Sequence, residues 1–120
     1  MASIADRVLD NGLTVLDTEA NRFDITSQEA TTYAEATSTY TLGNTTSISI
    51  GSPADRTGGG RKVTLAAISD ASVTGTGTAT HFAITDTSNS RLLVTGALNA
   101  SQSVNSGNLF DISALDIGIP

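Results

Sequence analysis

The sequence predicts a mainly β fold, an antiparallel β-sandwich or barrel-like domain with a short N-terminal helix. Three observations support this class. Threonine and serine replace charged residues over long stretches such as ATSTYTLGNTTSISIGS, and β-branched threonine suits a pleated, half-exposed surface. Apolar residues make up 38% of the chain and are spread along its whole length. They alternate with polar residues in short runs separated by turn residues, which is the pattern of antiparallel strands.

The length of the chain sets the expected domain organisation. A chain of 120 residues is the usual size of one domain, and it can bury roughly two-thirds of the surface that its unfolded form exposes. We therefore expect a single domain over residues 1–120. Within it, residues 1–20 form an N-terminal helix or arm, and residues 21–120 form the β-sandwich.

Residues 3–19, SIADRVLDNGLTVLDTE, fit either a helix or a hairpin. In the helix, Ser3 is the N-cap, and Gly12 costs about 1 kcal/mol relative to alanine. In the hairpin, Asn11-Gly12 forms a tight turn between two short strands, the first of which has little apolar character. We favour the helix because it places three leucines on one face. These are Leu9, Leu13 and Leu16.

The first half of the β region contains two predicted strands with a helical segment between them. NRFDITS, residues 21–27, alternates as a short strand, and TSISIG, residues 46–51, does the same. The segment QEATTYAEAT, residues 28–37, is rich in alanine and glutamate and is expected to form one or two helical turns. The predicted inward-facing residues of the strands are Phe23 and Ile25 in the first, and Ile48 and Ile50 in the second.

The central part of the chain predicts two further strands. RKVTLAAIS, residues 61–69, is expected to turn Val63, Leu65 and Ala67 inward. SVTGTGTATHFAITDT, residues 72–87, alternates over its whole length. The side chains that this alternation places on one face are Thr74, Thr76, Thr78, Thr80, Phe82 and Ile84. Glycines inside such a run often mark a bend or the close approach of another backbone.

The C-terminal part predicts a turn, two strands and a change of face. TSNS turns the chain into the strand RLLVTGAL, residues 91–98, and NASQSVNSGN, residues 99–108, is expected to be a loop or wide hairpin. In LFDISALDIGI, residues 109–119, the apolar positions slip by one residue. This slip predicts a β-bulge near Ala114-Leu115.

The stretch SPADRTGGG, residues 52–60, is a loop by composition and leads directly into a strand pattern. Glycines followed by basic residues suggest a phosphate-binding loop, but such a loop needs a preceding strand and a helix that opens with Lys-Ser or Lys-Thr. A strand follows here instead, so we interpret the segment as a flexible protein-contact loop. Extended to residue 62, this loop holds half of the six basic residues. Its candidate contact residues are Arg56, Gly58, Gly59, Gly60, Arg61 and Lys62.

No pattern in the sequence points to catalysis, a metal or a cofactor. His81, the single histidine, is interpreted as a partly buried, hydrogen-bonded residue of a strand. The segment DTSNS, residues 86–90, is interpreted as a turn rather than a calcium loop. A hydrolase that uses two carboxylates is the one enzymatic alternative, and the missing tryptophan argues against it. We interpret the acidic residues of the N-terminal fifth as a solvated face: Asp10, Asp17, Glu19 and Asp24.

Charge and hydropathy exclude two classes of partner. The formal net charge is −6, and an acidic chain without a basic stripe repels the phosphates of nucleic acid. No window approaches the roughly 20 apolar residues of a membrane-spanning helix, and the N-terminus lacks the basic and apolar regions of a signal peptide. The chain has no cysteine, which excludes disulfides and thiolate metal sites. We therefore expect partners that are proteins.

Several stretches taken together resemble small proteins encoded in the genomes of tailed bacteriophages and prophages. The most specific of these is THFAITDTSNSRLLVTG, which leads to the closing segment FDISALDIGIP, and the resemblance covers nearly the whole chain. One departure is Ala30, which stands where similar chains are expected to have a proline. The resemblance implies a virion-associated protein, and it offers no catalytic residues.

This resemblance leads to two hypotheses about function. The first is a structural virion protein that decorates or cements the capsid by binding the major capsid protein, as a homo-oligomer on the capsid surface. A trimer is expected by analogy with the three-fold positions of virion lattices. The second is a tail or spike component that recognises a host surface glycan or protein through polar loops. Docking is expected through the loop 52–62 and the N-terminal segment, with Ile4 and Val8 as its contacts.

Overall fold

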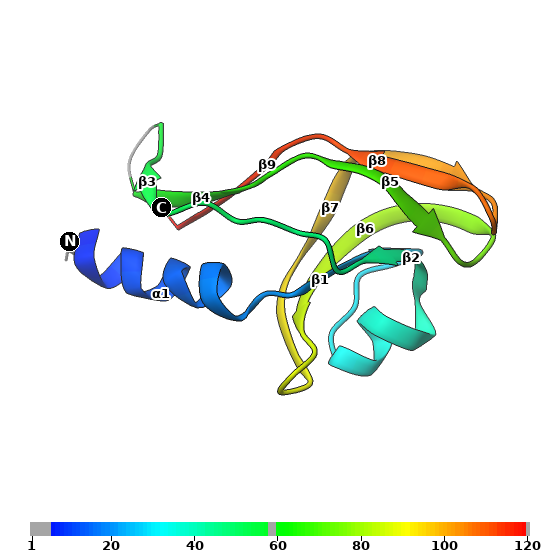
Figure 1. Ribbon diagram of the computed structural model, residues 1–120, viewed down its shortest axis with the longest axis horizontal. Coiled ribbons are helices and arrows are strands. Elements are labelled where there is room, and N and C mark those ends of the chain that lie inside the picture. The colour runs from blue at the N-terminus through cyan, green and yellow to red at the C-terminus, as the bar shows by residue number, and fades with distance from the viewer. Residues whose placement is uncertain (1–5, 58–59, 120) are drawn as a thin grey trace.

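The computed structural model describes residues 6–57 and 60–119 and consists mainly of antiparallel strands with one N-terminal helix (Figure 1). The elements are α1 (Asp6–Glu19), β1 (Arg22–Thr26), β2 (Thr41–Thr45), β3 (Ala54–Asp55), β4 (Arg61–Leu65), β5 (Ile68–Val73), β6 (Gly77–Asp86), β7 (Arg91–Val104), β8 (Leu109–Ile112) and β9 (Leu115–Ile119). A six-stranded sheet has the order β7-β6-β1-β2-β5-β8, and a three-stranded sheet has the order β3-β4-β9. The predicted fold class is confirmed, and this topology is compatible with a sandwich or a barrel.

One long ribbon joins the two sheets. Its first strand is β4 followed by β5, and its second is β8 followed by β9, so each half of the ribbon belongs to a different sheet. The pairs Leu65↔Leu115 and Ile68↔Ile112 lie in the same register on either side of the break between the sheets. Figure 1 shows this ribbon running along the molecule, with α1 beneath the end formed by β4 and β9. The molecule measures 47 × 28 × 26 Å.

The N-terminal segment is a helix, as favoured, and the hairpin alternative is wrong. Asn11-Gly12 lies inside α1 rather than in a turn. Leu13 and Leu16 are buried against Val63 of β4, which is the apolar face that the leucine spacing predicts. The predicted cap, Ser3, lies outside the described residues. Burial of the two leucines therefore outweighs the modest cost of a glycine within the helix.

Strand β1 follows the prediction, and the helical segment after it lies further toward the C-terminus than predicted. Phe23 and Ile25 enter the main core, where Phe23 stacks on Phe82 with ring centroids 5.8 Å apart. The expected helical turns begin at Tyr33 and continue as five residues of π-helix, Glu35–Thr39. The wider turn ends where the Tyr40 amide donates to the Glu35 carbonyl at 2.9 Å.

The predicted strand at residues 46–51 is wrong. The strand is β2, which lies just before it, and the predicted segment contributes only a single bridge, Ile50↔Leu65. Gly43 in β2 explains the miss, because a Cβ there would lie 2.7 Å from the Ser72 carbonyl oxygen and 2.9 Å from the Phe110 ring. A Gly-Asn pair indicates a turn in sequence, but here the glycine admits close neighbours.

Two long predicted strands are interrupted. The strand expected at 61–69 divides into β4 and β5, and Ala67, predicted to face inward, is exposed. The alternation over 72–87 breaks first at the turn between β5 and β6, and then at an irregularity between Ala79 and His81. Because of this irregularity Ala79 joins Phe82 in the core, while the threonines at 76 and 78 are exposed.

The C-terminal strands differ from the prediction in length and in the nature of the break. Residues 99–104, expected to be a loop, continue β7 to Val104. Turn residues begin only after this point, and the turn at residues 87–90 is confirmed. The predicted change of face near Ala114-Leu115 falls at the correct place. It is a transfer of the chain from the six-stranded to the three-stranded sheet, not a bulge within one strand.

Candidate functional site

The hairpin β3–β4 carries the basic residues that the sequence predicts as protein contacts. The Arg56 amide donates to the Gly60 carbonyl at 3.1 Å and closes the turn. Gly60 has a φ of 82°, a left-handed conformation that suits glycine. The prediction of loop throughout 52–60 is wrong at β3, where two residues pair with β4. Two of the predicted contacts lie outside the described residues: Gly58 and Gly59.

Ion pairs within the small sheet engage two of the predicted basic contacts. Arg61 Nη1 lies 2.5 Å from Asp55 Oδ1, and Lys62 Nζ lies 3.0 Å from Asp116 Oδ2. The Thr64 hydroxyl donates to Asp116 Oδ1 at 2.7 Å, and the hydrogen bonds from Thr64 and Lys62 hold the pKa of Asp116 below its ordinary value. In both pairs the carboxylate is solvent-exposed and the cation is partly exposed, so the pairs position charge rather than stabilise the fold strongly.

Arg56 and Lys62 border a small hollow on the face of this sheet that lies away from α1. The Arg56 side chain lies across β9, because a Cβ at Gly118 would come within 2.6 Å of its Cδ. The hollow has a volume of about 300 Å³. Its lining residues are Arg56, Thr57, Lys62, Asp116 and Gly118. Two cationic groups and one carboxylate here give the hollow a positive character within an acidic chain.

The helix α1 packs on the opposite face of the same sheet. Successive residues of a strand point to opposite faces, so Val63 contacts the helix whereas Lys62 faces the hollow. Ile4 lies outside the described residues, and so does the side chain of Val8. The predicted N-terminal segment and the predicted contact loop, distant in sequence, thus meet on one three-stranded sheet. Figure 1 shows the helix start, β3 and the C-terminal end of β9 at the same end of the molecule.

A larger cavity of about 470 Å³ lies between β7 and β8, at the other end of the ribbon. Three phenylalanines line it together with aliphatic residues of both strands. The aromatic residues are Phe23, Phe82 and Phe110. Asp111 is the single ionisable side chain among the lining residues, and its Oδ1 accepts the Asp70 amide at 2.8 Å. The cavity is therefore almost uncharged and partly aromatic, which is a typical composition of binding pockets.

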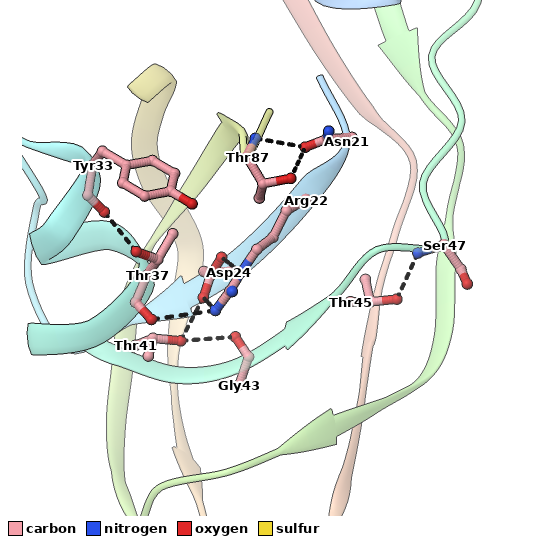
Figure 2. A network of polar contacts seen from close by, with 10 residues as sticks. All are labelled: Asn21, Arg22, Asp24, Tyr33, Thr37, Thr41, Gly43, Thr45, Ser47 and Thr87. Carbon is pink, nitrogen blue, oxygen red and sulfur yellow. Dashed lines mark hydrogen bonds and ion pairs between the residues drawn. The ribbon is translucent and has the colours of Figure 1, made fainter. Parts of the chain in front are cut away.

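A buried polar network lies on the other face of β1 (Figure 2). Asp24 has no exposed surface, so its assignment to a solvated acidic face is wrong. Arg22 donates to both of its oxygens at 2.8 and 2.9 Å, and the Thr41 hydroxyl donates at 2.6 Å. Arg22 also donates to the Thr37 carbonyl at 3.3 Å, and its hydrogen bonds to Asp24 raise its pKa. This network joins β1 to the π-helix, so its role is to hold these two elements together.

Sequence reasoning missed Asp24 and the cavity for different reasons. The alternation of β1 places Arg22 and Asp24 on one face, two residues apart, and an opposite charge at that spacing was the signal available. The residues of the cavity come from six strands and two connecting segments, so their meeting depends on the sheet order. The sequence alone indicated only the apolar character of Phe110 and its neighbours.

The remaining candidates have structural roles. His81 is half-buried, and its Nδ1 lies 2.8 Å from the Thr80 hydroxyl, which confirms the interpretation of this residue. At the turn after β6, the carboxylate of Asp86 accepts the Asn89 amide group and the Ser88 backbone amide, and these bonds lower its pKa. Within residues 6–57 and 60–119 no cluster of acidic and histidine side chains is suited to a metal ion.

Two further observations complete the description of the site. No helix within the described residues is long and apolar enough to cross a membrane. Comparison with family models, with curated proteins and with solved structures found no match for this chain.

Proposed function

We propose that this chain is a non-catalytic structural protein of a bacteriophage particle, one that decorates or cements the head by binding the major capsid protein. The observation that carries the proposal is the convergence of both predicted contact segments on the three-stranded sheet. Its helix covers one face, and the basic hollow occupies the other. A subunit that docks through one end of an elongated body is suited to cover a lattice of repeated sites.

The charge distribution supports docking through this end. The net charge of −6 favours solubility of the chain before it docks. Arg56 and Lys62 place two cationic side chains at the hollow, where Lys62 pairs with Asp116. We infer that the facing surface of the capsid protein is acidic or rich in carbonyl groups. Binding then depends on salt concentration, because the contact is formed by partly exposed charges.

Immunogold electron microscopy of purified particles, with antibody raised against this chain, tests the proposal. We expect label spread evenly over the heads, with a fixed number of copies per particle. The double charge reversal Arg56→Glu and Lys62→Glu is expected to reduce the number of copies bound. Arg91→Glu is the matched control, because the Arg91 side chain is 62% exposed and lies away from the hollow. Particles that carry no label would refute a virion role.

A second candidate function is recognition of a host surface glycan or protein by a tail or spike component. One specific observation favours it, namely that the cavity between β7 and β8 is bordered by uncharged hydrogen-bonding side chains. These are Gln102, Ser103, Asn105 and Asn108. In this case the gold label gathers at a tail tip or a single vertex, and the purified oligomer is retained on susceptible cells.

A further inference from the structure

The strands β7 and β8 follow one another in the chain but do not pair. A short turn connects them, and they form the two outer strands of the six-stranded sheet, each hydrogen-bonded on one side only within the described residues. Residues of both strands line the same cavity of about 470 Å³. We call this region the β7–β8 wedge. It combines a cavity that has an apolar floor and a polar rim with two strand edges that have no neighbouring strand in the described part of the chain.

The open edge of β8 continues into β9. Strand β8 pairs with β5 and β9 pairs with β4, with one register shift between Ile68 and Ala71. The outer edge of the ribbon therefore runs from Leu109 to Ile119, interrupted between β8 and β9. No proline or lysine, the residues that commonly protect an edge, occurs between these positions. The two carboxylates of this edge are engaged inward, Asp111 with the Asp70 amide and Asp116 with Thr64 and Lys62. The edge therefore lacks the proline and lysine that commonly block an added strand, and its carboxylates are engaged within their own sheets.

The chemistry of the wedge indicates what kind of strand it accepts. Its floor is formed by phenylalanine rings and aliphatic side chains, and its single ionisable lining group is the carboxylate of Asp111. Leu109 stands at its rim with 60% of its surface exposed. A complementary strand has apolar side chains on the face toward the cavity and carries neutral or basic residues elsewhere. An acidic strand is repelled by Asp111 and by the overall charge of −6.

We propose that an extended segment of a partner polypeptide, about six residues and roughly 20 Å long, inserts into the β7–β8 wedge. Its backbone pairs with the free edge of β8, and alternate apolar side chains fill the cavity, as in strand addition at other sheet edges. This inference rests on the proposed function for the identity of the partner, a segment of the capsid protein. The same edge continues along β9, which belongs to the three-stranded sheet. The contact of the inserted segment with β8 and the docking contact of the three-stranded sheet therefore form one continuous surface.

The test uses the purified full-length chain and a library of random heptapeptides displayed on ribosomal complexes. We expect the selected peptides to share alternating apolar positions and to lack aspartate and glutamate. Binding of a selected peptide is expected to increase hydrogen-exchange protection in β7 and β8. Strands β1 and β2, which already have neighbours on both sides, are expected to show no change.

Two pairs of variants locate the binding site. Leu109→Lys places a charge on the open edge and is expected to weaken peptide binding about tenfold or more. Val15→Lys is its control, because Val15 is the other large apolar side chain that is exposed in the described residues, at 38%, and it lies on α1. Ala100→Trp fills the wedge from β7, and Ala67→Trp makes the same change at an exposed alanine outside the cavity. Both controls are expected to bind as the parent chain does.

Three results would overturn the proposal. The first is selection of peptides without an extended apolar pattern, or equal binding to Leu109→Lys. The second is concentration-dependent self-association that Leu109→Lys abolishes, which assigns the wedge to a second copy of the chain. The third is tight binding of the neutral dye N-phenyl-1-naphthylamine that selected peptides do not displace, which assigns it to a small apolar molecule.

Particle loading separates this inference from the proposed function. If the parent chain is absent from particles, the virion role fails, whereas peptide binding in the wedge still stands or falls on its own data. If Leu109→Lys loads onto particles as fully as the parent chain does, the virion role stands and insertion of a capsid strand is refuted. Loss of loading in Leu109→Lys but not in Arg91→Glu supports both.

Discussion

The two faces of β1 are both buried, but by different chemistry. Phe23 and Ile25 enter an apolar core that extends to β6 through the stacked pair Phe23–Phe82. Asp24 and Thr26 point the other way, toward the layer that contains the π-helix, and neither has exposed surface. One strand of five residues thus separates two layers. The first is stabilised by burial of apolar surface, and the second by polar contacts.

This difference shows that burial has unequal requirements on the two faces. An apolar side chain is stabilised simply by leaving water, in proportion to its area. A buried polar group needs partners, and the polar face contains both extremes. Asp24 accepts three side-chain hydrogen bonds, whereas the hydroxyls of Thr26 and Thr85 have no hydrogen-bond partner in the part of the chain that the structure describes. On the polar face, burial is therefore compensated by hydrogen bonds at Asp24, whereas it destabilises the fold at Thr26 and Thr85.

The largest expected effect lies on the apolar face. Phe82→Ala removes the ring stacked on Phe23 and leaves a cavity beside a pocket that is already open, so we expect a loss of about 4 kcal/mol in the free energy of unfolding. Phe82→Leu keeps most of the volume and is expected to lose about 1 kcal/mol. Urea denaturation followed by circular dichroism measures both. Equal losses for the two variants would contradict a packing role for the ring.

Asp24→Ala tests the polar face and is expected to cost about 3 kcal/mol, because it leaves the partly buried Arg22 without its bidentate partner. The double variant Arg22→Met and Asp24→Leu replaces the whole pair by apolar groups of similar size. It is expected to recover at least about 1 kcal/mol of that loss in the same denaturation experiment. A double variant less stable than Asp24→Ala would mean that the pair contributes through its charges rather than through mutual satisfaction.

The unequal requirements of the two faces also explain how much of the fold the sequence predicts. Strict alternation identifies Phe23 and Ile25 as core residues, and the spacing of Leu13 and Leu16 identifies the apolar face of α1. These signals are local, because burial of an apolar side chain depends on its apolar surface area and needs no specific partner. Asp24 was misassigned because its burial depends on Thr41 and on the helical segment, which the strand pattern alone does not reveal.

Strand limits were less predictable than strand faces. Ala67 was expected inside, but the ribbon bends there as it passes from one sheet to the other. The alternation predicted for the threonine-rich stretch before Phe82 is broken in the structure by an irregularity between Ala79 and His81. No residue type at that point indicates the irregularity in the sequence. The basic residues of the β3–β4 hairpin could be predicted from composition. The β7–β8 wedge could not, because it depends on the sheet order, in which β7 and β8 do not pair.

Thr85→Val sharpens the comparison by removing one of the two unpartnered hydroxyls while keeping the side-chain shape. We expect the free energy of unfolding to rise by about 1 kcal/mol, since the cost of burying an unpaired hydroxyl disappears. Thr41→Val is the matched control, because the Thr41 hydroxyl donates to Asp24, and it is expected to lose about 1 kcal/mol. Thermal unfolding of both variants would show shifts of opposite sign, and a loss for Thr85→Val would indicate a hidden partner.

The smallest expected effect concerns carboxylates outside β1. Hydrogen bonds lower the pKa of Asp86 at the β6–β7 turn, of Glu35 at the start of the π-helix and of Asp116 in the small sheet. A carboxylate with a lowered pKa in the folded state contributes stability above its unfolded pKa, and this contribution is lost as the pH falls below about 5. The urea midpoint is therefore expected to decrease between pH 7 and pH 3. Asp86→Asn, which cannot ionise, is expected to show a smaller decrease, and an unchanged decrease would place the acid sensitivity at the other carboxylates.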